Sequence, residues 1–154
     1  GDRGNMLSLI KQVQKEEYVH VSGGVTPKSL IYANDLADAI LLAAARAPQG
    51  FNIYNIANPE PVSTKELVDT IAEVLGVTKK FPSVPEGLLK IGAGIARTFM
   101  PGKVPVTPEQ IEKLATETTC SIGKFVQATG FKPSTDLKSA ISKEVNWARE
   151  NQLI

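Results

Sequence analysis

The chain has 154 residues, of which 42% are hydrophobic and 21% charged, which is the size and composition of one globular domain. Its 17 basic and 16 acidic residues are interspersed and give a formal charge of +1, which excludes the basic surface of a nucleic-acid-binding protein. One cysteine and one histidine exclude a disulfide framework and the usual zinc sites, and no apolar run reaches the roughly 18 residues of a membrane-spanning helix.

The first third of the chain is expected to hold two helices and two short strands. Apolar residues at helical spacing predict a helix over 6–17, with Asn5 before it as N-cap. Runs rich in β-branched or aromatic residues, bounded by Gly or Pro, predict strands at 18–21 and 29–32, which either pair or join separate small sheets. An alanine-rich stretch predicts a long helix from 34 to about 48. Its apolar stripe consists of Leu36, Ala37, Ile40, Leu41 and Ala44.

The middle of the chain alternates strand and helix signals. Closely spaced apolar and aromatic residues predict a buried strand at 51–57. A capping box between Ser63 and Glu66 starts a helix that Gly76 ends. The segment 79–85 is then expected to be extended. This order is typical of an α/β protein.

Four further helix signals follow. A glycine-containing helix is expected over 86–99, and a threonine cap with proline behind it starts another at Thr107. Short apolar spacing predicts a helix over 123–129, which Gly130 stops, and a last helix spans 136–151. The loops between these elements are short, so we expect no interdomain linker.

No catalytic motif is present in the chain. It has no glycine-rich dinucleotide turn, no P-loop and no Tyr-x-x-x-Lys pair, so no catalytic residue is assigned. His20 is the one candidate acid or base, but its place between two valines favours a packing role. Cys120 has no partner histidine nearby and is expected to be inert. Lys28 near two glycines, and Asn5 at a helix start, are candidates for binding an anion, with solvated loop residues as the alternative.

The most specific motif spans residues 28–40 and reads KSLIYANDLADAI. It closely resembles the (R/K)-x-(F/L)-(I/V)-(Y/H)-V-x-D-(L/V)-A-x-A-(I/L) segment of the extended short-chain dehydrogenases. Y-N-I-A at 54–57, P-V-S at 61–63, G-F-K-P at 130–133 and V-N-W at 145–147 follow in that family's order. The resemblance covers essentially the whole chain, and within the family it is greatest to the nucleoside-diphosphate-sugar epimerases and 4-keto-sugar reductases of polysaccharide synthesis.

The resemblance implies an α/β fold: the helix-rich substrate-binding part of an extended Rossmann-fold dehydrogenase, with short strands and the last strand of the Rossmann sheet. Residues 1–154 would then be the C-terminal substrate-binding region. The Rossmann half, with its glycine-rich turn, catalytic Tyr-x-x-x-Lys and bound NAD or NADP, would lie upstream. The chain begins without methionine and with residues typical of a loop, so we expect it to be cut from a longer protein. By itself we expect it to bind no cofactor and to be inactive.

The resemblance also suggests binding residues. Asn5 matches an asparagine that approaches the pyrophosphate of the substrate, and Lys28 matches the cation, usually arginine, that holds it. A lysine offers a point charge where arginine makes a bidentate contact, so affinity or substrate would differ. His20 and Ser22 fall on the strand that lines the nucleotide base in relatives. The family's second phosphate-binding arginine is absent, and Arg97 is the candidate replacement.

Three functions are weighed. The leading hypothesis is an enzyme that oxidises and reduces carbon 4 of a nucleotide-linked sugar through a nicotinamide cofactor. The alternatives are an extended dehydrogenase acting on a steroid-like or other small alcohol, and a non-catalytic binding module. The expected partners are a nucleoside-diphosphate sugar, the missing Rossmann half and a second copy of the chain, without nucleic acid or membrane. A single cysteine fits a reducing compartment, so a cytoplasmic location is expected.

Overall fold

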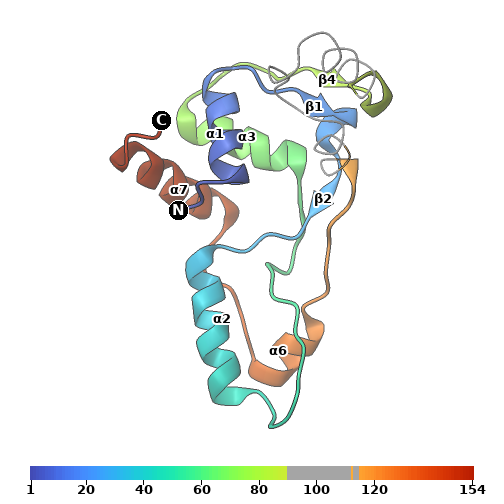
Figure 1. Ribbon diagram of the computed structural model, residues 1–154, viewed down its shortest axis with the longest axis vertical. Coiled ribbons are helices and arrows are strands. Elements are labelled where there is room, and N and C mark those ends of the chain that lie inside the picture. The colour runs from blue at the N-terminus through green and yellow to red at the C-terminus, as the bar shows by residue number, and fades with distance from the viewer. Residues whose placement is uncertain (90–111, 113–114) are drawn as a thin grey trace.

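The computed structural model describes residues 1–89, 112 and 115–154. Its described helices fall into two groups (Figure 1). The three-helix lobe contains α1 (Asn5–Gln14), α3 (Thr64–Leu75) and α7 (Leu137–Glu150). The two-helix lobe contains α2 (Ala33–Arg46) and α6 (Gly123–Thr129). The fold is therefore α/β and helix-rich, as the resemblance implied, and none of the described helices is long and apolar enough to span a bilayer.

Two small sheets lie beside the three-helix lobe. β1 (His20–Val21) pairs in parallel with β4 (Ser83–Val84), and β2 (Pro27–Lys28) pairs antiparallel with β3 (Val62–Ser63). A single 3-10 turn, η1 (Ser22–Gly24), connects β1 to β2. Of the two arrangements left open by the sequence, the one with separate sheets is confirmed.

The second predicted strand is displaced. The sequence predicted it at 29–32, but the strand is at Pro27–Lys28. Beyond Lys28 the backbone bonds to loops, since the amide of Ser29 donates to Thr118 and the carbonyl of Leu30 accepts from Asn58. Those partners come from distant segments, which local β-propensity does not reveal.

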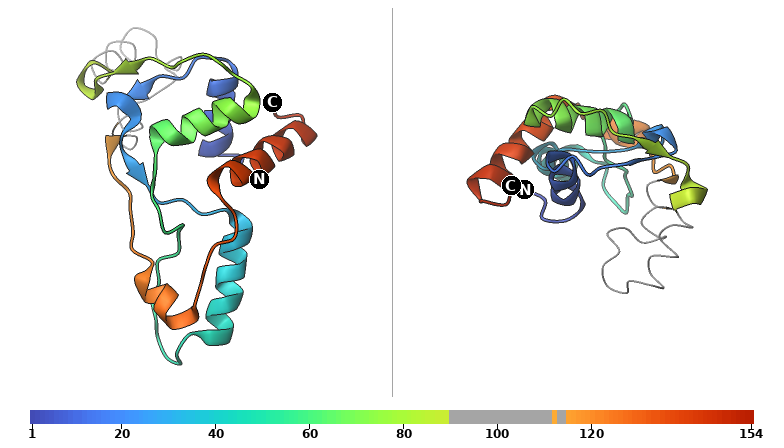
Figure 2. Two further views of the ribbon diagram at one scale, coloured as in Figure 1. Left: turned by 180° about the vertical axis from the view of Figure 1, so that it is seen from behind. Right: turned by 90° about the horizontal axis from the view of Figure 1, so that it is seen from above.

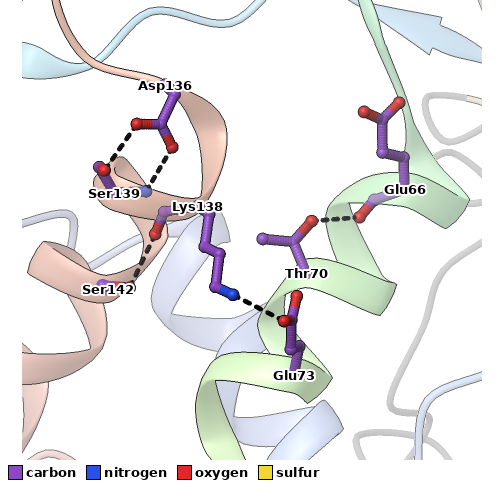
Figure 3. Close-up of polar contacts among 7 residues, drawn as sticks. All are labelled: Glu66, Thr70, Glu73, Asp136, Lys138, Ser139 and Ser142. Atoms are coloured by element: carbon purple, nitrogen blue, oxygen red, sulfur yellow. Dashed lines mark hydrogen bonds and ion pairs between the residues drawn. The ribbon is translucent and has the colours of Figure 1, made fainter.

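The core of the three-helix lobe explains why its helices pack together. Among the described residues, ten buried side chains from the three helices, from β3 and from the segment before β1 form one cluster. They are Ile10, Val13, Tyr18, Val62, Leu67, Val68, Ile71, Ala72, Ile141 and Val145. An exposed ion pair, 2.7 Å from the Lys138 ammonium to the Glu73 carboxylate, joins α7 to α3 at the rim (Figure 3). Burial of apolar surface, and not this ion pair, supplies most of the stability.

The predicted ends of the helices are mostly confirmed. The Ser63 hydroxyl accepts from the Glu66 amide at 3.0 Å, and Gly76 and Gly130 end α3 and α6 with φ of 76° and 73°. Asp136 caps α7 by accepting from the amide and hydroxyl of Ser139 (Figure 3). These signals are local in sequence, which is why the sequence predicts them well.

One predicted cap is wrong. Asn5 is the first helical residue of α1, and Gly4 is its N-cap. The Asp2 carboxylate instead accepts from the amides of Gly4 and Met6, at 2.7 and 2.8 Å. A carboxylate is favoured there because the helix start carries partial positive charge.

The buried face of α2 is also not the predicted one. In α2, Asp35 and Ala39 are buried, and Ala39 packs on Phe125 and Phe131 from the segment of α6 and its following turn. Within the predicted stripe, Ile40 and Leu41 are 58% and 69% exposed. Because α2 is apolar on both faces, helical spacing fits either of them and does not identify the buried one.

The predicted strand at 51–57 is not formed. These residues carry no strand, and within the described part of the chain none of their backbone groups bonds to another backbone group. Phe51 is 91% exposed. A strand needs a neighbouring strand, and none of the described segments supplies one.

Two predicted helices fall largely or wholly outside the described residues. Positions 86–89 are helical, while the rest of the predicted 86–99 helix and the start at Thr107 are not among the residues described. The extended segment 79–85 is confirmed at β4.

Candidate functional site

Lys28 lies in β2 at the junction of two segments. Its backbone pairs with Val62 on one side and forms an isolated bridge with Thr118 on the other. Its ammonium donates to the carbonyl of Thr116. Burial lowers the pKa of this ammonium from its ordinary value. The cation is therefore partly desolvated, which strengthens its attraction for an anion.

The turn before Lys28 is held in a glycine-dependent shape. Ser22, Gly23 and Gly24 have φ of 47°, 81° and 67°. A Cβ on Gly24 would lie 2.6 Å from Nδ1 of His20, so a side chain cannot be accommodated there without movement. The amide of Gly23 donates to Ser83 at 2.7 Å, which fixes the turn to β4.

His20 is buried beneath this turn. The ring is 4% exposed, and its centroid lies 5.1 Å from Tyr18 and 6.4 Å from Phe81, both in edge-on geometry. Among the described residues Nδ1 has no hydrogen-bond partner. Burial lowers the pKa of His20, against a smaller opposing effect of Asp69, so the ring is neutral at neutral pH. The described contacts of His20 are those of a packing residue.

The predicted site residues are only partly brought together. His20, Ser22 and Lys28 lie on the consecutive elements β1, η1 and β2. Ser22 is exposed, and its hydroxyl accepts from the amide of Glu86 at 3.3 Å. Asn5 is exposed at the start of α1, which packs on α3 (Figure 1). Arg97 lies outside the described residues.

Asp35 is a buried charge that the sequence analysis did not single out. It is 2% exposed and accepts from the amides and hydroxyls of Ser134 and Thr135 at 2.8–3.2 Å. Burial by itself would raise the pKa of Asp35, but these hydrogen bonds bring it below its ordinary value. The contacts join the first turn of α2 to the segment that runs from α6 up to α7 (Figure 2). The signal available in the sequence was the single carboxylate of Asp35 beside the apolar face of the predicted helix.

The chemistry supported by these residues is binding. The residues that the structure describes contain no group of three or more potential metal ligands. The candidate site contains a partly desolvated ammonium, an exposed hydroxyl and a turn of fixed shape. Together these features favour an anionic ligand. Neither His20, which is buried, nor Cys120, which is exposed, has a partner suited to nucleophilic chemistry among the described contacts.

Known proteins resemble this chain along part of their length. No family model matches the chain. A 4-epimerase of Escherichia coli O157:H7, which acts on N-acetyl-α-D-glucosaminyl-diphospho-ditrans,octacis-undecaprenol, is 23% identical over 95% of this chain and 45% of its own length. An uncharacterized protein of Sinorhizobium fredii is 26% identical over 93% of the chain and 42% of its own length. The chain thus spans less than half the length of the curated relatives it matches.

Solved structures agree in fold. The Bordetella bronchiseptica enzyme WbmF, solved with NAD+ and UDP, matches with a TM-score of 0.65 and 20% identity, over 97% of this chain and 37% of its own. The UDP-glucose 4-epimerase of Thermotoga maritima, solved with UDP-glucose, matches with a TM-score of 0.65 and 19% identity, over 99% and 41%. The chain has the fold of part of a sugar-nucleotide epimerase. A dTDP-glucose 4,6-dehydratase of Bacillus anthracis shares this epimerase-like fold, with a TM-score of 0.64 at 15% identity, over 97% and 40%.

Proposed function

We propose that the chain is the substrate-binding part of a longer NAD(P)-dependent enzyme that acts on a nucleoside-diphosphate sugar. One observation carries the proposal: a partly desolvated lysine, Lys28, lies beside a turn fixed by glycine, in a fold whose solved examples include an enzyme bound to UDP. A desolvated ammonium interacts more strongly with a phosphate than with a neutral hydroxyl. This difference favours a nucleotide sugar over a small apolar alcohol as the substrate.

Each site residue then has a role. Lys28 neutralises the pyrophosphate, and Asn5 and Arg97 are the further candidates for contacting it. Ser22 is exposed at the turn and offers a hydroxyl to the nucleotide. His20 is buried, so its role is to support the turn. Its ring occupies the space that a side chain at position 24 would need.

The chemical step belongs to other residues. NAD or NADP would supply oxidation and reduction at carbon 4 of the sugar. The chain contains no glycine-rich dinucleotide turn and no Tyr-x-x-x-Lys pair, so the residues that hold the cofactor are expected in a separate Rossmann half. This chain binds and orients the substrate, and by itself it has no activity.

The coding sequence upstream of residue 1 tests the enzyme proposal directly. We expect a glycine-rich turn and a Tyr-x-x-x-Lys pair within about 200 residues, which is the size of one further domain. Their absence from that sequence would favour a non-catalytic binding module.

Substitution of Lys28 tests the phosphate contact. Lys28→Ala is expected to weaken binding of UDP and UDP-glucose by about 1.5–3 kcal/mol, since a hydrogen bond to a charged group is lost. Lys15→Ala, at an exposed lysine after α1, is the matched control and should leave the affinity unchanged. Calorimetric titration of the longer protein measures both variants. Equal UDP affinity for Lys28→Ala and wild type, together with binding of an apolar alcohol, would instead favour the small-alcohol dehydrogenase.

A further inference from the structure

The turn η1 is held in an unfavourable backbone conformation. Its three residues, Ser22, Gly23 and Gly24, all have φ in the left-handed region, at 47°, 81° and 67°. Glycine adopts this region freely, whereas a serine there is strained. Strained residues persist only where the surrounding contacts hold them. The turn is therefore an element that would relax if its contacts were weakened.

Contacts from β4 and α3 hold this turn. On the β4 side, the amide of Gly23 donates to the hydroxyl of Ser83 at 2.7 Å. On the α3 side, a Cβ on Gly24 would lie 3.1 Å from the backbone N of Lys65, in the first turn of the helix. The turn is thus packed directly against the start of α3.

The start of α3 also anchors the strand that follows the turn. The carbonyl of Thr26 accepts from the amide and the hydroxyl of Thr64, at 3.2 and 3.3 Å. Lys28 lies two residues beyond Thr26, in β2. The turn that carries Ser22 and the strand that carries Lys28 therefore pack on the same helix end. A shift of the turn relative to this helix end would displace the proposed binding groups.

His20 is packed against the same point. Its Nδ1 lies 2.6 Å from the position that a Cβ on Gly24 would take, and the backbone N of Lys65 lies 3.1 Å from that position. The ring is 4% exposed, and within the described part of the chain Nδ1 has no hydrogen-bond partner. The ring thus fills the space beneath the turn without a group that would accept a proton from Nδ1.

A charged His20 ring would fit this place poorly. It carries an N–H group at both ring nitrogens, and the one at Nδ1 would meet Gly24 without an acceptor. The start of α3 carries partial positive charge, which repels a cation. An unpaired buried charge is costly, so we expect the charged ring to leave its place and the neutral ring to remain there.

The charged groups around His20 do not compensate for this cost. Burial lowers the pKa of His20 most, while Asp69 raises it and Lys65 lowers it further. Asp69 and Lys65, both on α3, form an ion pair with each other. The phenol of Tyr18 packs edge-on against the ring and stays uncharged, because burial raises the pKa of Tyr18 to about 12. Of the described elements packed against the ring, η1 and β4 contain no titratable side chain.

We propose that protonation of His20 releases η1 from the start of α3 and thereby weakens binding of the nucleotide sugar at Ser22 and Lys28. The inference rests on the proposed function, because the ligand is the one assigned there. The neutral ring supports the strained turn, and the charged ring moves out and lets the turn relax. Mild acid then lowers the affinity, and a return to neutral pH restores it.

NMR of the chain tests the release of the turn without any ligand. His20 is the single histidine of the chain, so its ring signals are unambiguous. We expect the amide signals of Gly23 and Gly24 to shift with the same midpoint as the His20 ring, below about pH 6.5. The amide signals of Ile71 and Val145, in the main core, should stay unchanged. Turn signals that do not follow the His20 ring, or core signals that move with it, would overturn the inference.

Titration of the longer protein with UDP-glucose measures the effect on binding. This ligand keeps its charge in mild acid because both of its phosphates are diesterified, whereas the terminal phosphate of UDP titrates near about pH 6. We expect the affinity to fall about three- to tenfold between about pH 7.5 and about pH 5.5, where tenfold is roughly the ratio of charged to neutral histidine at the lower pH. Equal affinity at the two pH values would contradict the inference.

Variants separate a pH switch from a purely structural role of the ring. His20→Phe and His20→Asn cannot titrate, so each should bind UDP-glucose equally well at both pH values, even if its affinity is lower overall. Asp69→Asn removes a carboxylate that favours the charged ring, so the midpoint should move to lower pH. Glu73→Gln, one turn further along α3, is the matched control and should keep the midpoint, since Glu73 pairs with Lys138. The wild-type pH dependence in both His20 variants would refute the switch.

Failure of the proposed function gives a different result. If Lys28→Ala leaves the affinity for UDP-glucose unchanged while Gly23 and Gly24 still titrate with His20, the proposed function is refuted and the release of the turn remains. If Lys28→Ala weakens binding but the affinity of the wild type does not depend on pH, the proposed function remains and the switch is refuted.

Discussion

Asp35 shows how much one buried charge contributes to the junction of the two lobes. Its carboxylate accepts four hydrogen bonds from Ser134 and Thr135. Asp35→Asn replaces one acceptor oxygen by an NH2 group that faces donors, so we expect unfolding free energy to fall by about 2–3 kcal/mol. Urea denaturation measures the change.

The matched control is Asp38→Asn, one turn further along α2. Asp38 is exposed, so its substitution should change the unfolding free energy by less than about 0.5 kcal/mol. Equal losses in the two variants would show that the helix charge, and not the buried contacts, matters. The lowered pKa of Asp35 adds a pH signature: its contribution is present above the unfolded pKa and is lost as pH falls toward the folded one.

His20 gives a second pH-dependent contribution. Burial lowers the folded pKa of His20 below its unfolded value near 6.5, so the unfolded chain takes up the proton first as pH falls. Stability is therefore expected to decrease as pH is lowered through about 6.5. His20→Phe keeps the ring contacts with Tyr18 and Phe81 and cannot titrate, so it should remove much of this decrease.

Thermal unfolding at about pH 7.5 and about pH 5.5 measures the effect, a window that keeps the His20 proton uptake apart from titration of the carboxylates. The quantity compared is the difference in Tm between the two pH values, in wild type and in His20→Phe. A difference that is the same in both proteins would mean that other groups cause it, and the neighbouring Asp69 and Lys65 would be the next to substitute.

At the level of single elements, helix α3 depends on its cap. The Ser63 hydroxyl accepts from the amide of Glu66 (3.0 Å), and α3 forms the centre of the main core. Ser63→Ala is expected to lower the unfolding free energy by about 1 kcal/mol. Ser142→Ala in α7 is the control, because the Ser142 hydroxyl bonds back to Lys138 within its own helix (Figure 3) and adds little. A smaller loss for Ser63→Ala than for Ser142→Ala would contradict the assignment.

Elements were predictable to the extent that their signals are local. The cap at Ser63 and the stops at Gly76 and Gly130 depend on neighbouring residues, and the structure confirms them. The buried face of α2 depends on what packs against it, and the predicted stripe is not the buried one. The same holds for 51–57, whose composition favours a strand but whose partner strand is not among the described residues.

At the level of the whole molecule, the two lobes differ in the size of their cores. Counted over the described part of the chain, the main cluster contains ten buried residues, whereas the cluster of the two-helix lobe contains three, Ala39, Phe125 and Phe131. Since less apolar area is buried, α6 is expected to open more readily than α3, with amide exchange at least about tenfold faster in native conditions. Equal protection of α3 and α6 would show that the chain unfolds as one cooperative unit.

The site was predicted in outline only. The sequence identified Lys28 as a candidate cation and Gly23 and Gly24 as a turn beside it, and the structure shows that burial lowers the pKa of Lys28 and that His20 holds Gly24. Ligand roles for Lys28 and Asn5 stay predictions. Asp35 was missed because its partners are about one hundred residues away in sequence.

The sequence by itself determined the class of fold, the ends of most helices and the absence of a recognisable catalytic motif, because spacing, caps and residue types are local properties. Only the tertiary structure decided which face of α2 is buried, that His20 packs against Phe81 and that Asp35 joins the lobes. Those outcomes depend on contacts between residues far apart in the chain, and hydrophobic spacing fits several such arrangements equally well.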